Sequence, residues 1–216
     1  MKLINALKTL FKPVAVIKYL FFPFMMANAG GTDFTAIIGA NQTITAKVET
    51  AKETWLGTSN GLWHISENGK HVCHLTTANS VMPSNQVTGI CTTPDGHMYA
   101  STNCGIIHFD GYTYNVISTE NAKLPTNNIS GIACDNSGYI WLATKTNGLV
   151  MLKGLKTWAI TTNNSILTSN GVSKIENDQW GNVIVSLDNN MMIAISDDGM
   201  TAIQQPVLPD VIATKD

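Results

Sequence analysis

Short apolar runs bounded by turn residues follow one another along most of the chain. Examples are "HMYAST" at 97–102, "YIWLAT" at 139–144 and "NVIVSL" at 182–187. Runs of this kind between Gly, Asn, Asp and Pro are typical of strands joined by hairpin turns. We therefore predict an all-β chain. Further strands are expected at 61–65, 71–75, 87–92, 105–109, 112–117, 129–134, 148–152, 157–161 and 172–175.

The strand pattern repeats with a period of about 43 residues. Four anchor positions, Trp55, Tyr99, Trp141 and Ile184, are spaced 44, 42 and 43 residues apart. Four short strands in each repeat are the layout of a propeller blade. We predict a β-propeller of about four four-stranded blades, either a small closed ring or part of a larger ring. The blades are expected at approximately 41–76, 85–118, 127–162 and 170–205.

Several residue types recur at fixed places in this repeat. A small residue stands two positions after each anchor, and an asparagine stands fourteen positions before it (Asn41, Asn85, Asn127 and Asn170). Large and small residues alternating on one strand face are how tapering inner strands fill space, so we expect the anchors to pack in the core. The alternative is an aromatic binding platform. The asparagines are expected to bond backbone groups of turns.

Residues 1–29 are expected to be a secretory signal peptide. Four lysines precede an apolar run from Tyr19 to Met26, and the segment ends in Ala27-Asn28-Ala29. A basic start, an apolar stretch and a small-x-small end predict cleavage after Ala29. The run is shorter than the roughly 20 residues of a membrane span, and no later segment is long and apolar enough. We therefore expect a periplasmic or secreted chain with no membrane span after cleavage.

The charge of the remaining chain argues against nucleic acid as a partner. The sequence holds thirteen basic residues, all lysine, and fifteen acidic ones, and four of the lysines lie in residues 1–29. Residues 30–216 thus carry a net charge of −6. Recognition of phosphates and bases relies on clustered Lys and Arg.

The four cysteines, Cys73, Cys91, Cys104 and Cys134, leave their redox state open. Their number is even, but three pairings are possible and the density is too low for a disulfide scaffold. One disulfide and buried free thiols are both compatible with the sequence.

Catalytic, metal and cofactor chemistry find little support. In "HVCH", His71 and Cys73 share a strand face whereas His74 points the other way, so three or four converging zinc ligands are not expected. His64 and His108 occupy equivalent places in successive copies, which could bring two imidazoles side by side, but Met151 and Met192 replace them later. No nucleophile elbow, phosphate loop or dinucleotide fingerprint is present, and no cofactor is expected. Turn geometry accounts for the carboxylates Asp135, Asp178, Asp197 and Asp198.

The third copy resembles a known family. The string "LP-x-N-N-I-x-x-I-x-x-D-x-x-G-x-I-W-L-A-T-x-x-x-G-L" from Leu124 to Leu149 is similar to the two-component-regulator propeller repeat, and the other copies resemble it with losses. The resemblance implies kinship with periplasmic sensor propellers of bacterial hybrid signalling proteins, many of which recognise glycan fragments. The departures are four copies only, without a following spanning segment, kinase or DNA-binding domain.

We therefore expect a non-enzymatic, exported module that binds a carbohydrate or a protein through loops at one end of the propeller. Trp180 is the one candidate ligand-binding residue, and the alternative for it is a packed turn residue. The alternative functions are a small propeller lyase or hydrolase acting on polysaccharide, and a truncated remnant of a longer sensor. Because the terminal segments show no polar cap, a homodimer that completes a larger propeller is also expected.

Overall fold

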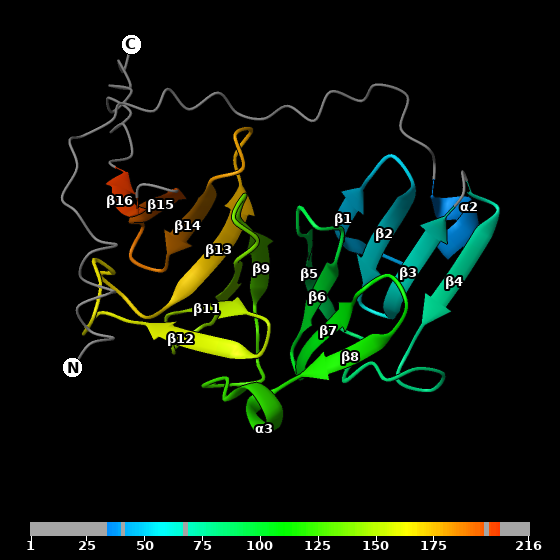
Figure 1. Ribbon diagram of the computed structural model, residues 1–216, viewed down its shortest axis with the longest axis horizontal. Coiled ribbons are helices and arrows are strands. Elements are labelled where there is room, and N and C mark those ends of the chain that lie inside the picture. The colour runs from blue at the N-terminus through cyan, green and yellow to red at the C-terminus, as the bar shows by residue number, and fades with distance from the viewer. Residues whose placement is uncertain (1–33, 40–41, 67–68, 197–198, 204–216) are drawn as a thin grey trace, which may run out of the picture.

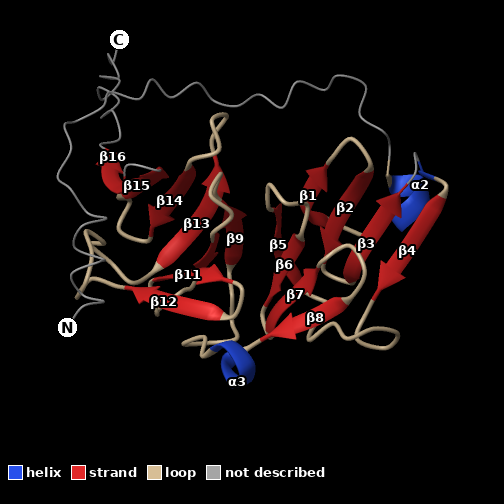
Figure 2. Ribbon diagram, in the orientation of Figure 1, coloured by secondary structure: helices blue, strands red, loops and turns tan. Residues whose placement is uncertain are grey.

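The structure, a computed structural model, describes residues 34–39, 42–66, 69–196 and 199–203. The expected signal peptide and Asn41, Asp197 and Asp198 lie outside these ranges. Four separate four-stranded antiparallel sheets make up the described chain, as the sequence predicted (Figures 1 and 2). Its two helices have four residues each, so neither is long enough to cross a membrane.

Each sheet is a blade whose strands follow chain order. The blades are numbered 1 to 4 from the N-terminal side, and the short helices lie before blade 1 and between blades 2 and 3. The elements are α2 Thr35–Ile38; β1 Ile44–Glu49, β2 Glu53–Thr58, β3 Gly61–Ser66 and β4 His71–Leu75; β5 Val87–Thr92, β6 Met98–Thr102, β7 Gly105–Phe109 and β8 Tyr114–Ile117; α3 Thr119–Ala122; β9 Gly131–Cys134, β10 Ile140–Ala143, β11 Leu149–Lys153 and β12 Lys156–Ile160; β13 Val172–Asn177, β14 Val183–Leu187, β15 Met192–Ser196 and β16 Gly199–Ile203.

The first strand of every blade is its inner strand. Contacts between blades run from β1 to β5, from β5 to β9 and from β9 to β13. Among the described residues, no contact of comparable extent joins β13 to β1. The blades therefore follow one another as an arc, which Figure 1 shows from blade 1 on the right to blade 4 on the left.

Apolar clusters fill the space between neighbouring blades. The anchors Trp55, Tyr99 and Trp141 are buried in them, with exposed fractions of 0%, 5% and 6%. This confirms core packing over the aromatic platform. Beside Trp55, a Cβ added to Gly57 would clash with Val87 of blade 2, so the small residue after the anchor lets the next inner strand approach.

A second column of apolar residues completes these clusters. Met82, Leu124 and Leu167 each stand three residues before a repeat asparagine, and each is buried between two blades. Because a buried Leu or Met side chain contributes roughly 1.5–3 kcal/mol, each member of this column adds to the packing between two blades.

The same column corrects the expectation that the ends carry no cap. Ile38 is its first member, and it is buried with Leu56 and Ile65 on the face of blade 1 that looks away from blade 2. Phe34 and Ile37 pack against this cluster. The segment before the first strand therefore covers an apolar face of blade 1.

The repeat asparagines bond backbone groups, as predicted. The side-chain oxygens of Asn85, Asn127 and Asn170 accept from the backbone N–H eight residues earlier, at 2.8, 2.8 and 2.9 Å. A second column, which the sequence analysis missed, does the same work in the same loops. Asn79, Asn121 and Asn164 each accept from the N–H three residues earlier and donate to the carbonyl five residues earlier.

Strand positions agree closely with the prediction, and the differences have local causes. β8 begins at Tyr114 rather than at residue 112, because Asp110 accepts hydrogen bonds from the N–H groups of Tyr112 and Thr113 and holds both in the turn. The lead-in of the third copy contains α3, whose N-terminus is capped by the Ser118 side chain.

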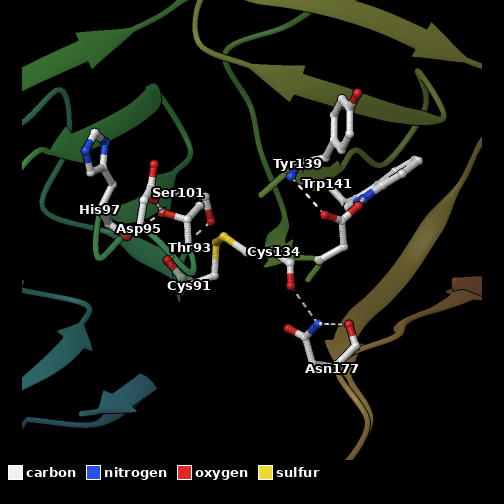
Figure 3. The surroundings of a disulfide bond; sticks show 12 residues. Cys91, Thr93, Asp95, His97, Ser101, Cys134, Tyr139, Trp141 and Asn177 are labelled. Carbon is white, nitrogen blue, oxygen red and sulfur yellow. Dashed lines mark hydrogen bonds between the residues drawn. A yellow bond between two sulfur atoms is a disulfide. The ribbon is translucent and has the colours of Figure 1, made fainter. Parts of the chain in front are cut away.

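One disulfide joins two blades. Cys91 on β5 and Cys134 on β9 are bonded, 43 residues apart in sequence, whereas Cys73 and Cys104 are free and exposed. Figure 3 shows the surroundings of this disulfide. The turn of blade 2 that carries Thr93 and Asp95 lies on one side of it, and the Asn177 side chain of blade 4 lies on the other. Asn177 Nδ2 donates to the Cys134 carbonyl at 2.8 Å, so blades 2, 3 and 4 are linked at one level.

Candidate functional site

One end of the arc gathers the most exposed large apolar side chains. This end carries the turns between first and second strands and between third and fourth strands, and we call it the turn face. Tyr112, Trp180 and Leu155, exposed by 93%, 61% and 60%, lie on three of its turns. These turns are 110–113 in blade 2, 154–155 in blade 3 and 178–182 in blade 4. No other large apolar side chain among the described residues is as exposed.

Trp180 is presented by a fixed backbone. Its N–H donates to Asp178 Oδ1 at 2.8 Å, and its carbonyl accepts from Asn136 Nδ2 of blade 3 at 2.9 Å. Gly181 has a φ of +83°, and a Cβ there would clash with Asn136. The alternative of a packed turn residue does not describe the Trp180 side chain, which stands out from an anchored loop.

Tyr112 is presented in a similar way. The Asp110 carboxylate accepts from the N–H groups of Tyr112 and Thr113 and from the Thr113 hydroxyl. The two backbone bonds, followed by the hydroxyl, lower the pKa of Asp110 to about 2. An ionised carboxylate thus organises the turn that exposes the phenol.

Asp135 and Asp178 also shape turns, as predicted. Asp135 Oδ1 accepts from the N–H groups of Ser137 and Tyr139, at 3.0 and 2.9 Å. Asp135 Oδ2 accepts from Trp141 Nε1 at 2.8 Å. These carboxylates are occupied by the fold, and neither forms an acid–base pair.

Blade 2 contributes a pair of histidines to the turn face. His97 Nδ1 and His108 Nε2 lie 2.9 Å apart, so one ring donates to the other. The His108 ring also stacks on Tyr99, with centroids 4.4 Å apart. Burial, followed by the charge of His97, lowers the pKa of His108, while Asp110 and Asp95 act in the opposite direction. The pair is therefore held in a state with at least one neutral imidazole near neutral pH.

Blade 3 adds a lysine over an aromatic ring. Lys153 Nζ lies 4.2 Å from the centroid of the Tyr139 ring and donates to the Ser137 carbonyl at 3.1 Å. Tyr139 follows the 135–138 turn directly, so this cation–π pair lies on the turn face.

The two histidines that the sequence aligned, His64 and His108, have different hydrogen-bond partners. His64 and His108 do oppose Trp55 and Tyr99 in their own blades, yet each has a different partner. His64 Nε2 bonds Glu53 Oε2 at 2.7 Å, whereas His108 meets His97. Met151 holds the equivalent place in blade 3, but in blade 4 the place belongs to Ala194 rather than Met192, because Ile184 pairs with Ala194.

His74 of the "HVCH" segment packs on an aromatic ring. His74 stacks on Trp63 with centroids 4.0 Å apart, and its Nε2 lies 2.8 Å from the Asn60 carbonyl oxygen. Within the described residues, no three His, Cys, Asp or Glu side chains come together as metal ligands.

The comparisons agree with the repeat analysis. Residues 123–146 match the family "Two component regulator propeller". The chain carries a two component regulator propeller repeat. The resemblance seen in the third copy is therefore confirmed, and the matched segment contains Asp135, Trp141 and the buried Leu124. No curated protein sequence matches the chain.

Solved propellers share the fold. The extracellular domain of BT3049 from B. thetaiotaomicron, described as part of a hybrid two component system, is similar with a TM-score of 0.61 and 20% identity over 76% of this chain and 23% of that one. The extracellular domain of BT4673 from the same organism gives 0.59 and 18%, over 78% and 26%. Virginiamycin B lyase from Staphylococcus aureus gives 0.59 and 16%, over 76% and 56%. The chain thus spans about a quarter of the two extracellular domains and just over half of the lyase, and the likeness is one of fold.

Some functional features could have been found in the sequence and others could not. The asparagines at 79, 121 and 164 recur at the same period as those already recognised. His97 and His108 come together only because the β6–β7 hairpin places them on one face, and no repeat signal marks that pairing.

Proposed function

We propose that this chain is the ligand-binding propeller of an exported protein and that it binds through the turn face. The observation that carries the proposal is the gathering of Trp180, Tyr112 and Leu155 at one end of the arc. The first two stand on turns whose backbones Asp178 and Asp110 fix. Binding sites favour aromatic side chains on a rigid scaffold, because their contact area costs little conformational entropy.

A carbohydrate is the ligand class that we favour, with a protein segment as the alternative. Flat aromatic side chains suit the apolar faces of sugar rings, and the Lys153 ammonium beside Tyr139 has further N–H donors for hydroxyl groups. The repeat family and the likeness to two extracellular domains support an exported, non-enzymatic sensor-like role.

Binding of the mature chain to a panel of oligosaccharides, measured by calorimetry, tests the proposal. Trp180→Ala and Tyr112→Ala are expected to weaken binding by about tenfold or more each, because a central aromatic contact is worth about 2 kcal/mol. Val81→Ala is the matched control, since Val81 is also exposed but lies at the opposite end of the arc. Equal losses in all three variants, or none in the first two, would contradict the turn face as the site.

A lyase or hydrolase acting on polysaccharide is the second candidate. The His97–His108 pair favours it, because an imidazole held partly neutral can take a proton from a substrate. Incubation with polysaccharides should then release products, and His108→Asn should abolish their release. A lack of product from every substrate would reject the enzymatic candidate.

Self-association into a larger ring is a separate proposal. The proposal is supported by the arc itself, because no contact of comparable extent joins β13 to β1 among the described residues. A dimeric molar mass in solution is the expected result, and a monomer at all concentrations would contradict it.

A further inference from the structure

A row of three side chains crosses blade 1 on one face of its sheet. Trp55 on β2 pairs with His64 on β3, and His64 pairs with Cys73 on β4. The Trp55 and His64 rings are stacked, with centroids 3.7 Å apart and planes 5° apart. The buried indole thus fixes the plane of the imidazole.

A carboxylate orients this imidazole further. His64 Nε2 lies 2.7 Å from Glu53 Oε2, and the two side chains are only 16% and 23% exposed. When one ring nitrogen donates to a carboxylate, the other ring nitrogen is the one left to accept a proton.

Cys73 stands at the open end of the row. Its thiol is free and exposed, and directly opposed residues in an antiparallel pair have Cβ atoms about 4.5–5.5 Å apart, so the side chains of Cys73 and His64 are neighbours on this face of the sheet. Tyr114 of blade 2 faces the same place. Burial first, and then the charges of Cys73 and Glu53, raise the pKa of Tyr114 to about 12.

We propose that Cys73 is a reactive thiol, with His64, oriented by Glu53, as its proton acceptor, and that it exchanges with low-molecular-weight disulfides. The arrangement of nucleophile, base and orienting carboxylate is the one that activates a thiol. It is built from three adjacent strands of one blade and is distinct from the turn-face aromatics.

The exchange step balances without another reactant. The Cys73 thiol gives its proton to His64, and its sulfur attacks one sulfur of the small disulfide. The disulfide bond breaks as the new sulfur–sulfur bond forms. The released thiolate takes the proton back from His64 and leaves as a thiol, so Cys73 ends as a mixed disulfide.

The chain contains its own control thiol. Cys104 is also free and exposed, but it lies in the short turn between β6 and β7, outside any cross-strand pair. Exposure alone predicts similar rates for the two thiols, whereas the proposal predicts that Cys73 reacts faster.

Peptide-resolved mass spectrometry of the intact chain treated with oxidised glutathione, and separately with iodoacetamide, measures both rates in one sample. At pH 7 Cys73 is expected to react about tenfold faster than Cys104, because His64 accepts the thiol proton as the sulfur attacks. His64→Gln should bring Cys73 close to the Cys104 rate. Equal rates in the unchanged chain would overturn the proposal.

A second variant keeps the test decisive if His64→Gln fails to fold. Glu53→Gln preserves the Trp55–His64 stack and removes only the carboxylate charge, so the Cys73 rate should fall several-fold while the Cys104 rate stays constant. Glu49→Gln, which removes a carboxylate from the same hairpin where it pairs with Lys47, should change neither rate. An unchanged Cys73 rate in Glu53→Gln would also contradict the proposal.

Discussion

Blades 1 and 3 have a tryptophan at the same repeat position, but the indole N–H is hydrogen-bonded in only one of them. In blade 3, Trp141 Nε1 donates to Asp135 Oδ2 at 2.8 Å. In blade 1, Trp55 Nε1 is buried without a hydrogen-bond partner. The cause lies in the preceding turn, where blade 1 is one residue shorter and has Thr50 in the place of Asp135.

The difference shows that the two repeats share the packing of the buried tryptophan but not the hydrogen bond to its indole N–H. Both indoles fill the same space between blades, but a threonine hydroxyl that already bonds Glu53 and Lys52 cannot replace the carboxylate. An unsatisfied buried N–H costs about 1–3 kcal/mol, so blade 1 is expected to be the weaker of the two.

The largest expected effect comes from breaking the covalent link of blade 3 to blade 2. Replacing Cys91 and Cys134 by serine opens a 43-residue loop in the unfolded chain and should lower the free energy of unfolding by about 4 kcal/mol. Urea unfolding measures the loss. Cys73→Ser with Cys104→Ser is the control and should leave stability almost unchanged.

The next largest effect is a difference in unfolding free energy between variants of the two turn side chains, Asp135 in blade 3 and Thr50 in blade 1. Asp135→Ala deletes three hydrogen bonds to a carboxylate, including the indole bond, and is expected to cost about 2–3 kcal/mol. Thr50→Ala deletes exposed hydroxyl bonds only and should cost about 1 kcal/mol or less. Equal losses in urea unfolding would contradict the contrast.

A smaller contrast is expected at the indoles themselves. Trp141→Phe removes a satisfied N–H and leaves Asp135 Oδ2 without its indole donor, whereas Trp55→Phe removes an N–H that has no partner. Both substitutions remove the same atoms from a buried site, so their packing losses should be similar. Trp141→Phe should therefore be the more destabilising by about 1–2 kcal/mol. The comparison of the two thermal transitions, or of their urea midpoints, measures the difference.

The smallest effect concerns pH and the histidine of blade 2. The pKa of His108 is lowered in the folded chain, so below about pH 6.5 the unfolded chain binds the proton first and stability falls with falling pH. His108→Asn should flatten the profile of unfolding free energy below about pH 6.5. Asp110, whose pKa is lowered to about 2, acts in a separate window, since its contribution is lost only as the pH falls from about 4 toward 2.

Much of the fold could be predicted because packing repeats in the sequence. The anchors, the asparagines and the strands at 71–75 and 87–92 all follow the period, and the structure has these two strands with the same bounds. The column Ile38, Met82, Leu124 and Leu167 follows it too, and recognising it would have predicted the cap on blade 1.

The site was harder to predict, because it depends on differences between repeats. The cysteine pairing was left open, although Cys91 and Cys134 are one repeat apart and lie on neighbouring inner strands. The Cys73–His64–Glu53 row needs the register of three strands. The turn that exposes Trp180 is anchored by Asn136 of the neighbouring blade. A contact between blades cannot be predicted from the local sequence pattern.

A pair of double-mutant cycles tests the central comparison most directly. One cycle combines Asp135→Ala with Trp141→Phe, and the other combines Thr50→Ala with Trp55→Phe, each followed by urea unfolding. The account predicts a coupling energy of about 1 kcal/mol or more between Asp135 and Trp141 and a value near zero between Thr50 and Trp55. Similar coupling energies in the two blades would contradict it.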